Sequence, residues 1–172
     1  AGTDPSLNFV GTTDYMSLTL AVSGTHALRL EPTLAIPNIV GGYQGNRVLS
    51  WGGIQAWGAT IGGGGMGAEP NEVHANYGTV GGGRGNVAVG EHATVSGGRG
   101  NTARGHRATV GGGENNTASA YGGVVAGGEL NTAGPASGIL SYYATVGGGI
   151  ANTASGYAAT IGGGEYISVT GQ

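Results

Sequence analysis

The chain lacks cysteine and lysine, and it carries little charge of either sign. Without cysteine it can form neither a disulfide framework nor a thiolate metal site. Its six arginines are outnumbered by nine acidic residues, which gives a net charge of −3. A generic nucleic-acid-binding protein needs an excess of basic residues, so that class is excluded. No run of about 18 apolar residues occurs, and we therefore expect no direct insertion into a membrane.

Large side chains are also scarce, since aromatic residues make up 6% of the chain and charged residues 9%. The usual charged share is about 25%. Disordered chains are rich in charged residues, proline and lysine, whereas this chain has five prolines and no lysine. Glycine accounts for 41 of the 172 residues, but without the strict three-residue spacing of collagen. This composition is typical of tight coils in which backbone packs against backbone.

What the chain does have is a repeat of 15 residues, close to Ala-Thr-Val-Gly-Gly-Gly-x-x-Asn-Thr-Ala-x-Gly. One column of the repeat is β-branched and a second is asparagine, and a fixed short period of this kind predicts stacked coils. The β-branched column, which we expect to form a structural core ladder, comprises Val40, Ile61, Val80, Val95, Val110, Val125, Val146 and Ile161. The asparagine column, which we expect to bond from coil to coil, comprises Asn46, Asn71, Asn86, Asn101, Asn116, Asn131 and Asn152.

Each repeat contains two short strands by our interpretation. Alternation places Ala93 and Val95 on one face and Thr94 on the other, and Asn101 and Ala103 likewise share a face. We expect the face with the small and β-branched residues to line a narrow interior. Glycine also occurs two residues after every member of the core ladder, which predicts a positive φ or a close backbone approach at that position. The predicted fold class is all-β, a parallel β-solenoid with coils of about 15 residues.

The chain divides into an N-terminal entry segment, residues 1–37, and glycine-rich solenoid repeats, residues 38–172. Residues 16–22 and 27–30 alternate at period 2 around Ser23-Gly24-Thr25-His26, which predicts a β-hairpin. Three insertions interrupt the repeats, and insertions in solenoids emerge on the surface and often form the binding face. The bulky residues that we assign to these candidate recognition loops are Trp51, Trp57, Met66, Tyr142 and Tyr143.

The thin core predicts association. A coil offers two or three small apolar side chains, and burial of a valine contributes about 1.5–3 kcal/mol. Ordering the backbone costs on the order of 1–2 kcal/mol per residue, and more for glycine. We therefore expect several chains to bury one face of each solenoid in a symmetric bundle.

The repeat read at residues 144–158, Ala-Thr-Val-Gly-Gly-Gly-x-x-Asn-Thr-Ala-Ser-Gly-Tyr-Ala, resembles the head repeats of trimeric autotransporter adhesins. It is also similar to glycine-rich repeats of bacterial surface proteins and phage tail fibres that carry endosialidase-type chaperone domains. Residues 8–14 and 27–32 are similar to the segment that precedes such repeats. The resemblance implies a left-handed parallel β-roll, with three chains around one axis, that is displayed outside the cell and used for attachment.

These observations predict a non-enzymatic extracellular adhesin or fibre segment, with the chain itself and an unknown surface protein or glycan as partners. One alternative is a structural filament, because the open ends of a stack expose strand edges. Ice or surface binding through a threonine column is another. That column comprises Thr60, Thr79, Thr94, Thr109, Thr145 and Thr160.

We expect no catalytic, cofactor or metal site. Acidic residues are isolated except for Glu69 and Glu72, and no Ser/His/Asp arrangement is evident. Neighbouring coils do carry basic residues that could bind an anion or could instead offset nearby glutamates. These residues are Arg84, Arg99, Arg104 and Arg107, with His92 and His106.

Overall fold

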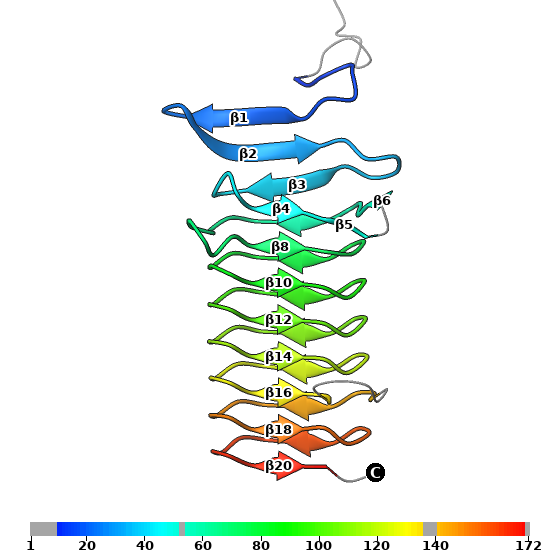
Figure 1. The fold of residues 1–172 in the computed structure, drawn as a ribbon, viewed down its shortest axis with the longest axis vertical. Coiled ribbons are helices and arrows are strands. Elements are labelled where there is room, and N and C mark those ends of the chain that lie inside the picture. The colour runs from blue at the N-terminus through cyan, green and yellow to red at the C-terminus, as the bar shows by residue number, and fades with distance from the viewer. Residues whose placement is uncertain (1–9, 52–53, 136–140, 171–172) are drawn as a thin grey trace, which may run out of the picture.

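The computed structural model describes residues 10–51, 54–135 and 141–170, leaving aside the side chains of Ser50 and Trp51. These ranges contain strands and turns and no helix. The chain winds into about seven stacked turns of about 15 residues (Figure 1). The predicted all-β parallel solenoid is therefore confirmed.

The coils build two sheets that run along the stack, and a small hairpin lies beside them. Sheet A has ten strands, in the order β1 (Leu18–Val22), β2 (Thr25–Glu31), β3 (Asn38–Gly41), β7 (Thr60–Ile61), β9 (Thr79–Val80), β11 (Thr94–Val95), β13 (Thr109–Val110), β15 (Val124–Val125), β17 (Thr145–Val146) and β19 (Thr160–Ile161). Sheet B has eight strands, β4 (Arg47–Val48), β8 (Glu72–Val73), β10 (Val87–Ala88), β12 (Thr102–Ala103), β14 (Thr117–Ala118), β16 (Thr132–Ala133), β18 (Thr153–Ala154) and β20 (Ser168–Val169). The hairpin pairs β5 (Ser50–Trp51) with β6 (Ile54–Gln55).

Successive coils pair in parallel and in strict register. Val95 is opposite Val80 on one side and Val110 on the other, so each residue meets its equivalent in the next coil. Where an insertion intervenes, the register is kept, and Val125 pairs with Val146. Neighbouring strands of a sheet lie about 4.8 Å apart, and this distance therefore sets the rise of each coil.

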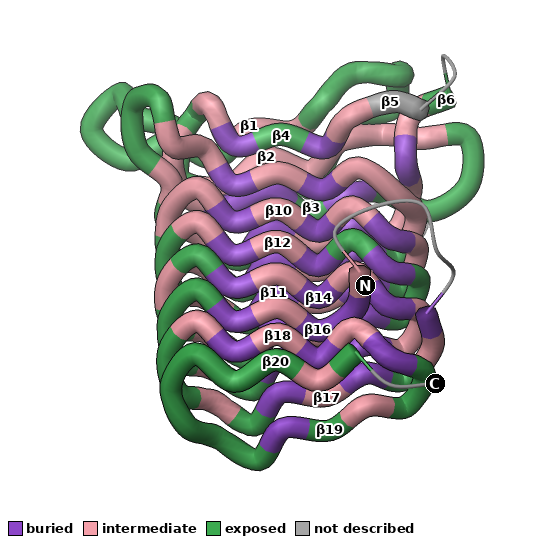
Figure 2. The backbone as a smooth tube through the Cα atoms, turned by 60° about the horizontal axis from the view of Figure 1, so that its bottom comes forward, coloured by how far each residue is buried: buried purple, intermediate pink, exposed green. Residues whose placement is uncertain are grey.

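The core lies between the two sheets and consists of small residues. All eight residues of the core ladder point inward, and each is 0–4% exposed. Sheet B contributes Val48 and Val73, followed by alanine in each of the coils from Ala88 to Ala154. Figure 2 shows these buried positions repeating at the same place in each coil. Because only alanine, valine and isoleucine make up this apolar core, the interior is narrow, as the sequence predicted.

The asparagine column forms a continuous hydrogen-bonded ladder inside the solenoid. All seven members are fully buried. The Oδ1 of Asn101 accepts from the backbone N–H of Asn116, 3.0 Å away in the next coil. Its Nδ2 donates to the carbonyl oxygens of Gly97 and Gly113, each at 2.9 Å. In the last described coil Ile167 takes the asparagine position, and its N–H donates to Oδ1 of Asn152.

The glycine requirement lies one residue later than the sequence suggested. The prediction of a positive φ or a close approach holds at Gly42, and Gly112 and Gly148 have a φ of +155°. It is wrong at Gly97, where a Cβ would meet nothing within 4 Å, and the same is true of Gly63, Gly82, Gly127 and Gly163. The following residue, Gly98, has a φ of +89°, and a Cβ there would collide with the carbonyl oxygen of Gly113. The turn places its positive φ and its inter-coil contact at this second glycine.

The entry segment covers the first coil. Strands β1 and β2 form the predicted antiparallel hairpin, and Ser23 and Gly24 both have positive φ, as in a type I′ turn. Strand β2 then pairs antiparallel with β3, the first strand of the solenoid. Arg29 donates to the backbone oxygen of Asn46 at 2.9 Å, which ties the hairpin to the coil below. Because β2 pairs with β3, the outer edge of β3 is already occupied.

Candidate recognition surface

One edge of the solenoid, where each coil returns from sheet B to sheet A, gathers most of the aromatic side chains that the structure describes. Two consecutive turn positions form columns there, and we call them together the aromatic corner. The first column comprises Trp57, Asn76, Glu91, His106, Tyr121, Tyr142 and Tyr157. The second comprises Gly58, Tyr77, His92, Arg107, Gly122, Tyr143 and Ala158, all with φ between 49° and 64°.

The turn backbone holds these columns in line. From Tyr77 to Ala158, the N–H of each second-column residue donates to the carbonyl oxygen of the first-column residue one coil earlier, as from His92 to Asn76 at 3.1 Å. The same bond runs from Tyr143 to Tyr121 at 2.8 Å. Non-glycine residues seldom adopt this left-handed conformation, so its recurrence is imposed by the coil geometry. Successive side chains consequently project from one edge at the spacing of the coils.

Several aromatic rings stack along the corner. The rings of Tyr77 and His92 are parallel within 4°, with centroids 4.9 Å apart. The ring of His106 stacks on Tyr121 at 6.1 Å, and Tyr142 lies 5.6 Å from Tyr121. The guanidinium of Arg107 lies 5.5 Å from the centroid of the Tyr121 ring. The corner therefore presents an aromatic surface that extends over several coils.

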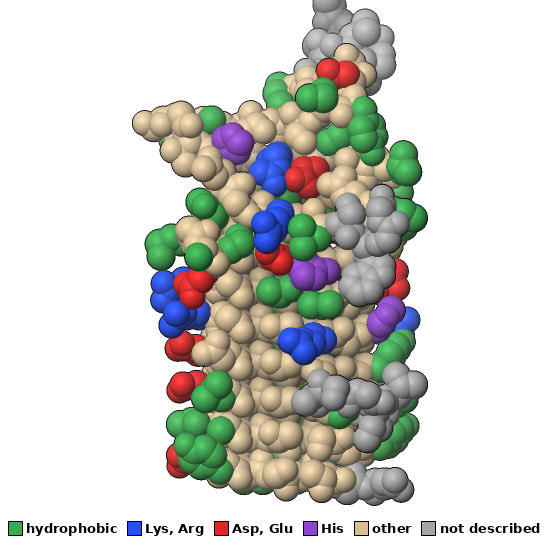
Figure 3. All heavy atoms as spheres, viewed as in Figure 1, with side chains coloured by type: hydrophobic (Ala, Val, Ile, Leu, Met, Phe, Trp, Pro, Cys, Tyr) green, Lys and Arg blue, Asp and Glu red, His purple; other side chains and the backbone are tan. Residues whose placement is uncertain are grey.

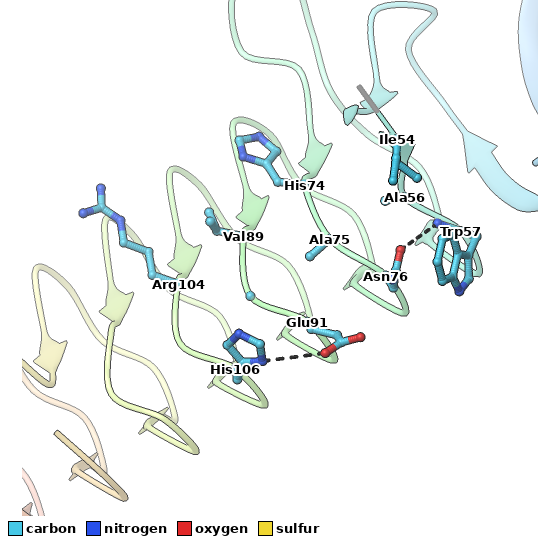
Figure 4. A pocket seen from close by; sticks show the side chains of 11 residues that line it. Ile54, Ala56, Trp57, His74, Ala75, Asn76, Val89, Glu91, Arg104 and His106 are labelled. Carbon is cyan, nitrogen blue, oxygen red and sulfur yellow. Dashed lines mark hydrogen bonds and ion pairs between the residues drawn. The ribbon is translucent and has the colours of Figure 1, made fainter. Parts of the chain in front are cut away.

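A pocket of about 440 Å³ opens beside this corner near the N-terminal end of the stack. Its upper end is bounded by Ile54 of hairpin β5–β6, and the turns of the next coils form its floor and walls (Figure 4). The side chains that line it are Ile54, Ala56, Trp57, His74, Ala75, Asn76, Val89, Glu91, Arg104 and His106, together with the backbone of Gly90. The first insertion, which carries the hairpin, therefore creates a concave surface on an otherwise regular edge.

The polar side chains of the pocket are partly tied to neighbours. Nε2 of His74 lies 2.8 Å from Oε2 of Glu72, which also pairs with Arg47. Burial raises the pKa of Glu72, but hydrogen bonds from His74 and Arg47 and their charges outweigh it, so the net pKa is lowered. Nδ1 of His106 lies 3.7 Å from Oε2 of Glu91. Arg104 forms no ion pair with any residue that the structure describes.

The basic residues do not form one patch, because the coil divides them between its two edges. Arg84 and Arg99 lie on the opposite edge, where Glu69 pairs with both, at 3.3 and 3.1 Å, and Glu114 lies 3.0 Å from Arg99. The hydrogen bond and charge of Glu69, with the charge of Glu114, raise the pKa of Arg99. Figure 3 shows basic and acidic side chains next to one another along the left edge of the molecule. Of the glutamates expected to offset these basic residues, Glu114 pairs with Arg99 and Glu91 with His106, but the main partner of Arg84 and Arg99 is Glu69. Arg104 lines the pocket instead.

The five bulky residues assigned to loops occupy different surroundings. Trp57, Tyr142 and Tyr143 lie at regular turn positions of the aromatic corner rather than within inserted segments. Met66 lies on the opposite edge, bridges antiparallel to Glu69 and is 58% exposed. Trp51 pairs with Ile54 in hairpin β5–β6, and its side chain lies outside the described atoms.

Sequence reasoning missed His106, Tyr121 and Tyr157 as members of one surface. The signal was available, because His106 and Tyr121 are 15 residues apart, as are Tyr142 and Tyr157. The same period that identified the valine column therefore identifies this one. The chemical variety of its members, which include tryptophan, glutamate and histidine, conceals the column from a search for one residue type.

No set of three or more metal-ligating side chains gathers within the described ranges. In the same ranges no helix has the length and apolar character needed to cross a membrane. Comparison of the chain with protein-family models, with curated proteins and with solved structures found no match.

Proposed function

We propose that this chain is a non-enzymatic, extracellular attachment segment, an adhesin or fibre head or stalk. In this proposal three copies associate around one axis as a left-handed roll and display their aromatic corners. The observation that carries the proposal is the division of the surface. The rigid stack gathers aromatic rings and a pocket on one edge, while sheet A presents a face without charge.

Sheet A is the face that we propose to be buried between copies. None of its solenoid strands, from β3 to β19, contains a charged residue, whereas sheet B includes Arg47 and Glu72. The six threonines predicted as a column lie on the outward side of sheet A, in register, with Val124 in the same column. A flat neutral face can pack against its copies without burying an unpaired charge.

The thin core of the single chain also supports association. The stack is elongated (Figure 1), and its interior consists of small residues, which supply little hydrophobic stabilisation per ordered residue.

A pair of matched double variants tests this association. Thr94→Arg with Thr109→Arg places charges on the outward side of sheet A, and Thr102→Arg with Thr117→Arg does the same on sheet B. We expect wild type and the sheet B variant to show three times the chain mass of 16.7 kDa in light scattering. The sheet A variant should fall to the single-chain mass with its strand circular dichroism retained. Wild type at the single-chain mass, or a sheet A variant that stays trimeric, contradicts the proposed interface.

Attachment is tested with beads coated with the protein and a mucin-coated surface, with albumin-coated beads as reference. We expect wild-type beads to adhere more than the reference, and Trp57→Ala or Tyr142→Ala beads to lose adhesion. Tyr166→Ala is the matched control, because Tyr166 is 75% exposed but lies outside the aromatic corner. Wild-type adhesion at the reference level, or equal loss in the Tyr166 variant, argues against recognition by the corner.

The structure disfavours the filament alternative at the N-terminal end. A second copy would have to add its last coil to the first strand in the parallel register that the coils use. That edge of β3 is occupied by β2, which pairs with it antiparallel. Stacking at this end would require the hairpin to leave its place.

A further inference from the structure

The pocket beside hairpin β5–β6 has the dimensions of a small-molecule site. Its volume of about 440 Å³ falls within the roughly 300–1,000 Å³ typical of such sites. Its lining runs from Trp57 in the first coil to His106 in the fourth, a span of about 14 Å at the coil spacing. Between these ends the floor consists of Ala75 and Gly90, which leave room for a flat ring.

One end of the pocket is apolar. Ile54, at the hairpin, and Trp57, at the turn that follows it, both line this end, and Val89 lies between it and the far end (Figure 4). Indole rings combine a large apolar face with low conformational freedom, and this makes them effective anchors for ligands. The C–H faces of sugar rings suit such a surface, because they are apolar while their hydroxyl groups point outward.

The other end of the pocket is cationic. Arg104 and His106 lie there, away from Trp57 (Figure 4). A guanidinium presents a planar fork of donors that matches a carboxylate, and Arg104 has no carboxylate partner among the described residues. Glu91, between the two ends, offers carboxylate oxygens that accept hydrogen bonds from hydroxyl groups.

We propose that this pocket binds an acidic disaccharide unit of a glycan, with one sugar ring against Trp57 and Val89 and the carboxylate of the neighbouring sugar on Arg104. A neutral sugar leaves Arg104 unpaired, and a simple anion leaves the apolar end empty. A disaccharide that carries a carboxylate is long enough to satisfy both ends at once. The inference rests on the proposed attachment function and specifies the chemistry that the corner recognises.

Calorimetric titration of the full chain with three acidic oligosaccharides tests the proposal. The probes are sialyllactose, trigalacturonic acid and a hyaluronan tetrasaccharide, and lactose serves as the neutral reference. We expect at least one acidic probe to bind about tenfold or more tightly than lactose, since charge-assisted hydrogen bonds are the stronger class. Absence of binding by all three acidic probes, or affinity equal to that for lactose, overturns the proposal.

Two variants locate the binding. Arg104→Gln should weaken binding of the acidic probe about tenfold or more, and Trp57→Ala should weaken it as well. Arg84→Gln is the matched control, because Arg84 is an arginine on the opposite edge that pairs with Glu69. An unchanged affinity in the Arg104 variant, or an equal loss in the Arg84 variant, refutes the assignment.

The two proposals can fail separately. Beads that adhere through the corner while all three acidic probes fail to bind would leave attachment standing and remove the acidic-sugar site. Probes that bind through Arg104 while coated beads do not adhere would leave the site standing and remove the attachment function.

Discussion

Replacement of Asn101 by alanine should destabilise the protein more than a deletion in its apolar core. The side chain of Asn101 is fully buried and makes three hydrogen bonds. Its loss leaves the N–H of Asn116 and the carbonyl of Gly97 without partners, at about 1–3 kcal/mol each. The carbonyl oxygen of Gly113 still accepts from the N–H of Arg99, at 3.0 Å. Loss of its second hydrogen bond, from Asn101, therefore costs only about 0.5–1.5 kcal/mol. The expected total is roughly 3–7 kcal/mol.

Val95→Ala provides the comparison, because Val95 lies in the same coil and is equally buried. It removes apolar groups worth about 0.8 kcal/mol each and leaves a small cavity, a loss of about 2 kcal/mol. Urea unfolding followed by circular dichroism measures both variants, and equal slopes show that the same unit unfolds. An Asn101→Ala midpoint equal to or above that of Val95→Ala would refute the reasoning. It would mean that packing, and not the asparagine ladder, holds the coils together.

The adjacent glycines of one turn should respond oppositely: Gly98→Ala should lower the melting temperature sharply, because its Cβ would meet the carbonyl oxygen of Gly113 at a positive φ. Gly97→Ala, with nothing within 4 Å, should leave it unchanged or raise it, and equal effects in thermal scans would contradict this turn geometry. Glu72→Gln should destabilise the protein at pH values above 4.5, the ordinary pKa of the carboxyl group. Because folding lowers the pKa of Glu72, the ionised carboxylate stabilises the folded state in that pH range. The difference from wild type should vanish as the pH falls through the lowered pKa, and a difference that stays constant from neutral pH into that acidic range would show that the ion pairs contribute nothing.

The period of the chain made most of the fold predictable. Residues 15 apart can be equivalent only if each coil repeats the backbone path of the last, so Val80, Val95 and Val110 had to align. The alternation of the entry segment likewise predicted its hairpin, with Ser23 and Gly24 at the turn. The same regularity misled at the glycines, because Gly97 and Gly98 recur together and only the turn geometry distinguishes them.

The candidate site was less accessible, because it depends on distances that the period does not encode. Sequence placed Arg84, Arg99 and Arg104 in neighbouring coils but did not place them around the circumference. The structure sets Arg84 and Arg99 beside Glu69 on one edge and Arg104 in the pocket on the other. The pocket also needs hairpin β5–β6, whose path over the coils is not part of the repeat.

By itself, the sequence determined the repeating unit, the inward columns and the asparagine ladder, because these follow from position within one coil. Tertiary structure decided what lies across a turn or beneath an insertion: which glycine must be glycine, which arginine lines the pocket, and which rings stack. Such contacts join residues whose spacing around the coil depends on the exact backbone path, and that path is fixed only when each coil rests on the next.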